Sequence, residues 1–148
     1  MHSLGLLFLR VIIGAIMMAH GYPKLFGGKD RSEQLPAEAK EALGESFEES
    51  VEQGGIDQTA KMMGRLDLPN PKASALAVGL AEFGGGLALI LGWKARPAAL
   101  AIVFSQLVAI NKVHADQGLV GGYELNASLI AGAGCIAIAG PGKIAVDR

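Results

Sequence analysis

The chain has 148 residues, of which 51% are hydrophobic and only 5% aromatic, and its net charge is −1. The length is that of one domain, 1–148, and the charge excludes a nucleic-acid-binding protein. A single cysteine, Cys135, excludes disulfide chemistry within the chain. Ten of the fourteen acidic residues lie between Asp30 and Asp67, so the remaining sequence carries little charge. Long apolar runs of this kind are typical of membrane proteins.

Four apolar segments are long enough to span a lipid bilayer, for which a helix needs roughly 20 residues. They cover about residues 4–20, 73–92, 97–113 and 123–140. The third begins at Pro97, which suits a first helical turn, and the fourth is ended by Gly140-Pro141-Gly142. Because short turns join the last three segments, the sequence predicts an all-α fold, a transmembrane antiparallel four-helix bundle.

The first segment could instead be a cleaved signal peptide, or the whole chain could be a soluble bundle. A signal peptide is disfavoured because Arg10 falls inside the apolar stretch and no Ala-x-Ala site follows it. A soluble bundle is disfavoured because residues 73–91 have no polar face beyond Ser74 and Glu82. The membrane bundle is therefore the preferred interpretation.

The connection between the first two spans, about residues 27–70, is a long polar insertion. Residues 36–53 are rich in helix formers and are followed by Gly54-Gly55, which predicts a helix that stops there. A second short helix, capped by Asp57, would end before Pro69. Such helices suit a cover over the bundle or a position in the membrane interface, with the acids facing water. The sequence assigns no role to those acids.

Glu82 is the only charged residue in the apolar run from Ala73 to Trp93. A carboxyl group at that depth costs roughly 2.5–3.5 kcal/mol on insertion scales, so it needs a partner, a proton or a function. Arg10 lies at a comparable depth in the first span, since a helix rises about 1.5 Å per residue. Because charges inside membranes usually pair, we predict an intramembrane charge pair of Arg10 with Glu82.

A second group of polar residues lies at the span ends nearest the insertion. His20 ends the first span, His114 ends the third, and Glu124 begins the fourth. Gln106 and His114 share a helix face, and so do Glu124, Ser128, Ala131 and Cys135; both faces are expected to point into the bundle. The candidate polar cavity or quinone site is therefore formed by His20, Lys24, Gln106, His114 and Glu124.

Histidine titrates near neutral pH, which suits proton transfer beside a quinone carbonyl. Two histidines and a carboxylate could also bind a metal, but no helix carries two such ligands one turn apart, so we assign no metal site. The sequence identifies no catalytic residue.

At these residues the chain resembles the DoxX family of small bacterial membrane proteins. The resemblance rests on His20-Gly21-x-Pro23-Lys24-Leu25-Phe26, Leu68-Pro69-x-Pro71, Ala81-Glu82-x-x-Gly85-Gly86, Leu89-x-Leu91-Gly92, His114 and Gly140-Pro141-Gly142-Lys143-x-x-x-Asp147. It covers residues 4–28 and 66–148, whereas the acidic segment of about residues 30–60 is longer than is usual in the family. The resemblance implies a four-span bundle that is a multi-pass protein of the bacterial cytoplasmic (inner) membrane. It also implies a link to redox metabolism, because the family takes its name from a membrane subunit of thiosulfate:quinone oxidoreductase and some relatives are linked to oxidative-stress complexes.

Three functions are compatible with these features. The first is a membrane subunit of a quinone-linked or oxidative-stress redox system. The sequence contains no haem or iron–sulfur ligand set, so a redox partner protein would supply the electron-carrying cofactor. The second is an assembly or scaffold protein without catalysis. The third is a small transporter or proton pathway through Glu82, for which four short spans would need a homo-oligomer.

The direction of insertion is predicted from basic residues near the span ends. An even number of spans places both termini on one side, together with Lys94, Arg96, Lys143 and Arg148. The insertion carries more basic residues in total, but long loops obey the positive-inside rule less well. We therefore expect the termini to be cytoplasmic.

Overall fold

The computed structural model describes residues 2–147; Arg148, one of the basic residues used above, lies outside the described residues. Contacts within the chain define two compact units. The first takes in the chain up to Met18 and from Gly84 onward, and the second is Ala19–Phe83. A single membrane domain of 1–148 stays a prediction.

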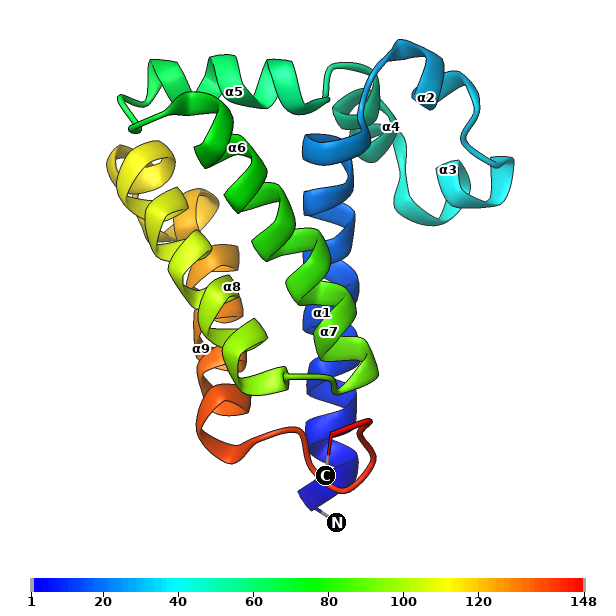
Figure 1. Cartoon of the computed structure of the whole chain (residues 1–148), viewed down its shortest axis with the longest axis vertical. Helices are drawn as coiled ribbons and strands as arrows, with labels where there is room; N and C mark the ends of the chain where they lie inside the picture. Colours follow the sequence, from blue (N-terminus) through cyan, green and yellow to red (C-terminus); the bar gives the residue numbers. More distant parts are fainter. Residues whose placement is uncertain (1, 148) are drawn as a thin grey trace. The chain divides into compact units, whose positions relative to one another are not determined.

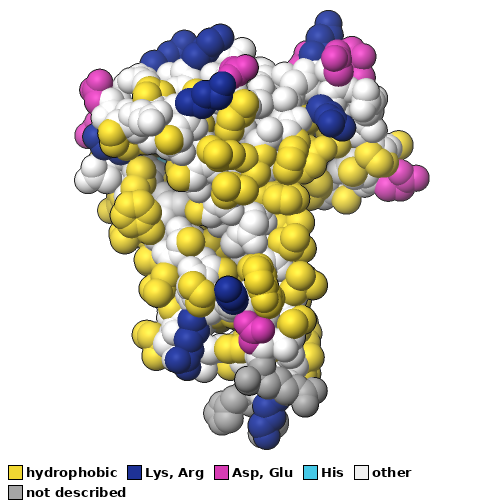
Figure 2. Space-filling view, in the orientation of Figure 1, with side chains coloured by type: hydrophobic (Ala, Val, Ile, Leu, Met, Phe, Trp, Pro, Cys, Tyr) yellow, Lys and Arg dark blue, Asp and Glu magenta, His cyan; other side chains and the backbone are white. Residues whose placement is uncertain are grey.

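Within residues 2–147 every regular element is a helix, as predicted. Four helical stretches are long and apolar enough to cross a membrane, judged by length and composition: Ser3–Phe26, Pro71–Leu91, Ala95–Gln117 and Leu119–Ala139. They coincide with the four predicted spans, so the prediction of four apolar helices is confirmed. Hydrophobic side chains cover much of the visible surface over these stretches (Figure 2). Large apolar residues on these stretches are exposed, such as Phe8 at 71% and Phe104 at 69%, which suits contact with lipid.

The first unit is built on α8 (Ala95–Ala109) and α9 (Glu124–Ala139), which lie side by side (Figure 1). It also contains α7 (Gly85–Leu91) and the first part of α1 (His2–Phe26). A Cβ added to Gly86 would lie 2.6 Å from the carbonyl oxygen of Gly14, so α7 and α1 approach backbone to backbone. The buried core consists of Ile13, Met17, Leu89, Ala95, Ala99, Ile102, Leu129, Ala133 and Ile136.

Three short irregular elements connect α8 with α9. A π-helical turn, η2 (Ile110–His114), and a 3₁₀ turn, η3 (Ala115–Gln117), extend α8. Before α9, the segment η4 (Leu119–Tyr123) leaves helical geometry at Val120 and Gly121. The third apolar stretch therefore runs beyond its predicted end.

The predicted inward face of α9 is corrected by the structure. Leu129, Ala133 and Ile136 of α9 are buried in the core, whereas Glu124, Ser128, Ala131 and Cys135 are exposed. The face that carries Leu129 and Ile136 removes more apolar area from the surroundings than the face that carries Glu124 and Ser128. These four residues are therefore all exposed, but the prediction that they point into the bundle is wrong.

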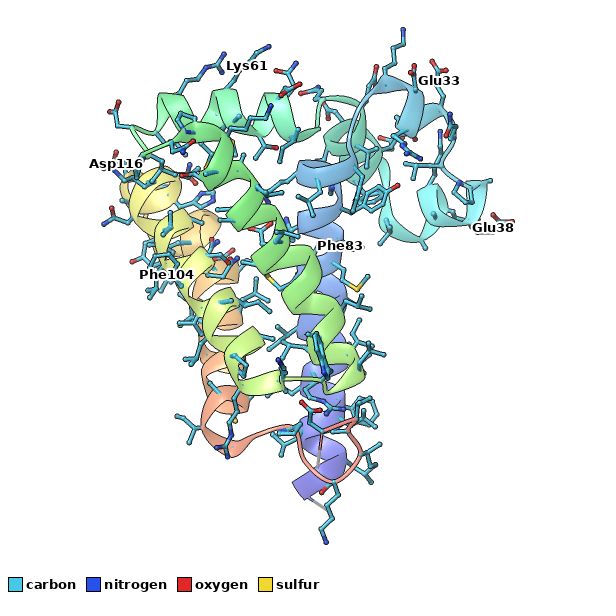
Figure 3. All side chains as sticks on the ribbon, viewed as in Figure 1. Glu33, Glu38, Lys61, Phe83, Phe104 and Asp116 are labelled. Carbon is cyan, nitrogen blue, oxygen red and sulfur yellow. The ribbon has the colours of Figure 1, made fainter. Side chains whose placement is uncertain are left out.

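The second unit contains the last part of α1 and five further helices. These are α2 (Lys29–Glu33), α3 (Ala37–Leu43), α4 (Glu45–Glu52), α5 (Ile56–Arg65) and α6 (Pro71–Gly79), followed by the π-helical turn η1 (Leu80–Gly84). The helix predicted over residues 36–53 is broken at Gly44, whose φ of +83° favours glycine. Gly55, rather than Asp57, caps α5. Charged side chains of this unit, among them Glu33, Glu38 and Lys61, point away from the helices (Figure 3).

Helix α1 continues six residues past the predicted end of the first span, through Pro23 to Phe26. A proline near a helix end removes only one backbone hydrogen bond. The aromatic rings of Tyr22 and Phe26 offset that loss, because they pack against Phe47 of α4 and Phe83 of η1, with centroid distances of 5.3–6.1 Å. The extra turns of α1 place Lys24 one helical turn after His20, which decides the geometry of the site.

Candidate functional site

Lys24 and Glu82 form an ion pair inside the second unit. The Nζ of Lys24 donates a hydrogen bond to a carboxylate oxygen of Glu82. It also donates to the backbone oxygen of His20 at 3.0 Å, one turn back along α1. The Glu82 side chain is 6% exposed and that of Lys24 is 22% exposed. The ammonium group of Lys24 therefore lies against a carboxylate that the fold removes from water.

Glu82 lies in the π-helical turn η1, between α6 and α7. A π-helical turn inserts an extra residue into the helical ladder, and such turns are frequent at functional sites. Two glycines let this segment approach α1 closely. A Cβ on Gly21 would collide with the Phe83 backbone and lie 2.9 Å from the Glu82 Cβ, and one on Gly79 would meet Leu25. The glycine of the His20-Gly21 sequence is thus required by the contact that brings Glu82 to Lys24.

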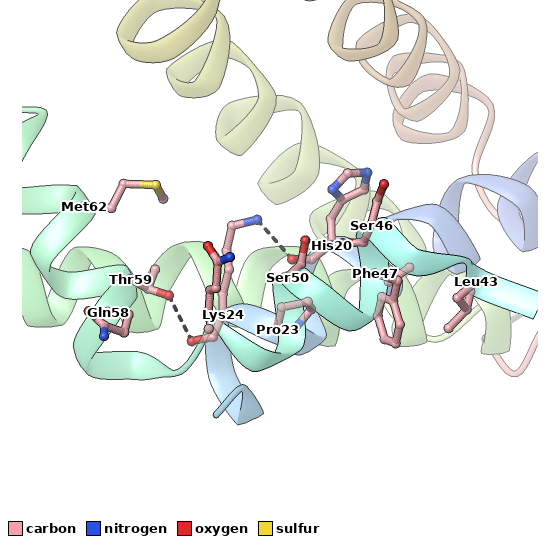
Figure 4. Close-up of a pocket in the computed structure, with 13 residues that line it drawn as sticks. His20, Pro23, Lys24, Leu43, Ser46, Phe47, Ser50, Gln58, Thr59 and Met62 are labelled. Atoms are coloured by element: carbon pink, nitrogen blue, oxygen red, sulfur yellow. Dashed lines mark hydrogen bonds between the residues drawn. The ribbon is translucent and has the colours of Figure 1, made fainter. Parts of the chain in front are cut away.

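A cavity of about 460 Å³ lies beside this pair (Figure 4). Small-molecule sites in proteins typically measure about 300–1,000 Å³. Helix α1 contributes Ala19, His20, Pro23 and Lys24; the remaining lining comes from α3–α5 and the turn between them, and consists of Leu43, Ser46, Phe47, Ser50, Gln53, Gly54, Gln58, Thr59 and Met62. The lining combines apolar surface with hydroxyl, amide, imidazole and ammonium donors. None of the described lining residues is an Asp or Glu, although this segment is the acidic part of the chain.

The turn between α4 and α5 is fastened to the last turn of α1, which holds the cavity together. The hydroxyl of Thr59 lies 3.1 Å from the Lys24 backbone oxygen, a contact drawn in Figure 4. The N–H of Gly55 donates to the Pro23 oxygen at 2.8 Å. A Cβ on Gly27 would lie 2.6 Å from the Gly54 Cα, so only glycines allow these backbones to meet. The Gly54-Gly55 break expected to end a helix therefore also docks the insertion on α1.

Arg10 has different partners from the predicted one. Its Nη1 and Nη2 donate to the backbone oxygens of Pro141 at 2.8 Å and Ile144 at 2.6 Å, within the first unit. Arg10 is 1% exposed, and its Nε has no hydrogen-bond acceptor among residues 2–147. The predicted Arg10–Glu82 pair is thus replaced by two separate interactions. The guanidinium group of Arg10 donates to two backbone oxygens of the segment after α9. Glu82 pairs instead with Lys24, which lies in the last turns of α1.

The other candidate residues have local partners. Gln106 is buried in the first unit, where its Oε1 accepts a hydrogen bond of 2.8 Å from Asn126 Nδ2. His114 Nδ1 lies 2.9 Å from Gln117 Oε1. The Glu124 carboxylate accepts from the Gly121 N–H at 3.1 Å, at the start of α9. Among the side chains described, those of residues 3–147, no three of His, Cys, Asp or Glu come close enough to hold a metal ion.

The structure therefore brings His20 and Lys24 to one cavity and adds lining residues from the insertion. Sequence reasoning missed Ser46, Ser50, Gln53, Gln58 and Thr59. Their only signal was amphipathic spacing in α4 and α5, where Phe47 and Met62 mark the apolar sides. Nothing in that spacing indicates which surface the polar residues would face.

These features define a helical membrane protein with four apolar helices, a buried ion pair and a cavity. A family model described as DoxX matches residues 5–115, and the chain belongs to the DoxX family. The matched range includes His20, Lys24 and Glu82. No curated protein and no solved structure matches the chain.

Proposed function

We propose that the protein is a membrane subunit of a redox system and binds the head of a quinone in the cavity beside His20 and Lys24. The observation that carries this proposal is the lining, which is partly apolar, contains no carboxylate and includes the polar side chains of His20, Lys24, Ser46 and Gln58. A quinone has carbonyl acceptors on a flat apolar ring, so it needs such surroundings. Electrons reach the quinone from a redox partner protein.

The same proposal includes the arrangement in the bacterial cytoplasmic membrane. The four apolar helices cross it as an antiparallel bundle, the insertion lies at the opposite side from the termini, and the termini are cytoplasmic. Lys94, Arg96 and Lys143, close to the ends of the apolar stretches, support this direction. Reporter enzymes fused after the last residue test this direction of insertion. A reporter that works only in the periplasm should be inactive, and a reporter that works only in the cytoplasm should be active.

Binding of a soluble short-chain quinone to the full chain in lipid nanodiscs tests the site. His20→Ala and Lys24→Met each remove a donor. We expect Lys24→Met to weaken binding at least about tenfold, since a hydrogen bond from a charged donor contributes about 1.5–3 kcal/mol, and His20→Ala to weaken it several-fold, since a neutral one contributes about 0.5–1.5 kcal/mol. Lys61→Met is the matched control, because Lys61 is exposed on α5 and does not line the cavity. Binding unchanged by Lys24→Met, or no binding by the unaltered protein, contradicts the proposal.

The residues His114 and Glu124 offer a second place for the quinone. In the same titration, His114→Ala decides between the two places. A loss of binding in His114→Ala with full binding by His20→Ala would move the site to η2 and the start of α9. We expect the reverse, since His20 lines the described cavity.

A scaffold without catalysis is the second candidate, and the close-packed Lys24–Glu82 pair favours it. In that case Glu82 only joins α1 to the second apolar stretch. Glu82→Gln would then lower the amount of folded protein and leave any redox activity per folded molecule unchanged. A proton pathway through Glu82 predicts a third result, loss of proton flux in liposomes with folding intact.

A further inference from the structure

The cavity beside Lys24 has an unusual balance of charge. Lys24 is the only Lys, Arg, Asp or Glu among its 13 described lining residues. The ammonium of Lys24 is in turn paired with Glu82, which stands behind it and is not part of the lining. A ligand in the cavity therefore meets N–H and O–H donors without meeting a net charge from this pair.

The ammonium group of Lys24 has three N–H donors. One is bonded to Glu82 and one to the His20 oxygen. The third has no acceptor among residues 2–147, and Lys24 lines the cavity. This donor suits a carbonyl oxygen of the ligand.

We infer that Glu82 determines which charge of ligand the cavity accepts, and that by cancelling the ammonium of Lys24 it makes the site select uncharged carbonyl compounds over anions of the same shape. The inference rests on the proposed quinone site and deepens it: the preferred form is a neutral quinone. An anionic ring loses hydration on entering a partly apolar cavity, and it regains attraction only if a cation there is uncompensated.

Glu82→Gln removes the negative charge that cancels the ammonium charge of Lys24. Glutamine has nearly the same size and still offers an oxygen to Lys24, but it leaves the ammonium charge uncancelled. The variant site should therefore gain affinity for anions relative to neutral ligands. Glu82→Asp keeps the negative charge and serves as the matched control.

Three ligands of similar shape make the measurement: unsubstituted naphthoquinone, a hydroxynaphthoquinone that is ionised at neutral pH, and its uncharged methyl ether. Binding of each is titrated by equilibrium dialysis against the full chain in nanodiscs of zwitterionic lipid, so that lipid charge does not contribute. The methyl ether controls for the bulk of the substituent.

We expect the unaltered protein to bind the two neutral compounds at least about tenfold more tightly than the anion, the difference that about 1.4 kcal/mol produces. Glu82→Gln should shift this ratio at least about tenfold toward the anion, and Glu82→Asp should leave it unchanged. The ratio in the unaltered protein tests the inference even if Glu82→Gln fails to fold.

Two results overturn the inference alone: equal binding of the anion and its methyl ether by the unaltered protein, or an unchanged ratio in folded Glu82→Gln. If the unaltered protein binds none of the three compounds, the proposed quinone site itself fails. The two failures are therefore distinguishable in one set of titrations.

Discussion

Lys24 and Glu82 are 58 residues apart in the chain, and their side chains are bonded to each other with the carboxylate almost fully buried. The interaction joins the end of α1 to the π-helical turn in the second apolar stretch. It accounts for a carboxyl group in a run that is otherwise free of charge. It also places one cation at the edge of a cavity.

Breaking this pair should destabilise the fold. Removal of one partner from a buried ion pair costs roughly 3–5 kcal/mol, and the partial exposure of Lys24 favours the lower end, about 3 kcal/mol. Glu82→Leu and Lys24→Met should each lower the thermal unfolding midpoint in detergent. The double variant should recover much of the loss, because neither charge is then left alone. Full additivity of the two losses would contradict the pairing.

Gly21 should tolerate alanine far less well than another helical glycine. A Cβ at Gly21 collides with the Phe83 backbone, so Gly21→Ala forces α1 away from η1, and overpacking of this kind costs about 1–3 kcal/mol. Gly134 of α9 has nothing within 4 Å of its Cβ position. Gly134→Ala should therefore be neutral or gain up to about 1 kcal/mol in helix propensity. Equal unfolding midpoints for the two variants would rule out the close approach.

Arg10 should hold the segment after α9 in place. Two hydrogen bonds from its guanidinium reach the Pro141 and Ile144 oxygens, and each such bond contributes about 1.5–3 kcal/mol. Arg10→Gln should release the segment, so trypsin should cleave after Lys143 faster than in the unaltered protein. Lys94→Gln is the control. Lys94 bonds the segment through its backbone N–H, which donates to the Asp147 carboxylate at 2.5 Å, so a change of its side chain should leave that bond in place. Equal cleavage rates in both variants would contradict this role.

Asn126 should stabilise the first unit through Gln106. Asn126→Ala leaves the buried Gln106 oxygen without its donor, and we expect a loss of about 1 kcal/mol, typical of hydrogen bonds between helices in membranes. Ser128→Ala is the control, since the exposed Ser128 hydroxyl bonds only to the Glu124 oxygen on its own helix. Chemical unfolding in mixed micelles measures both. A larger loss for Ser128→Ala would show that the Gln106–Asn126 contact contributes little.

The candidate site could be predicted only in part. His20 and Lys24 stand out because they are the histidine and the lysine at the end of the first apolar run, and both line the cavity. Glu82 stands out because it is the only charged residue inside an apolar run, but the sequence predicts Arg10 as its partner. That pairing is predicted because Arg10 and Glu82 lie at similar depths along their helices. Depth alone does not show which side of a helix a residue occupies, and it does not show that α1 continues through Pro23.

Four apolar helices and their order follow from the sequence alone, because the tendency to enter a membrane depends on the composition of about 20 consecutive residues. The folded chain was needed to pair Lys24 with Glu82, to give Arg10 its two carbonyl partners and to turn Ser128 and Cys135 outward. These features depend on contacts between residues far apart in the chain. Such contacts are decided by close approaches, such as those at Gly21 and Gly54, which no local pattern encodes.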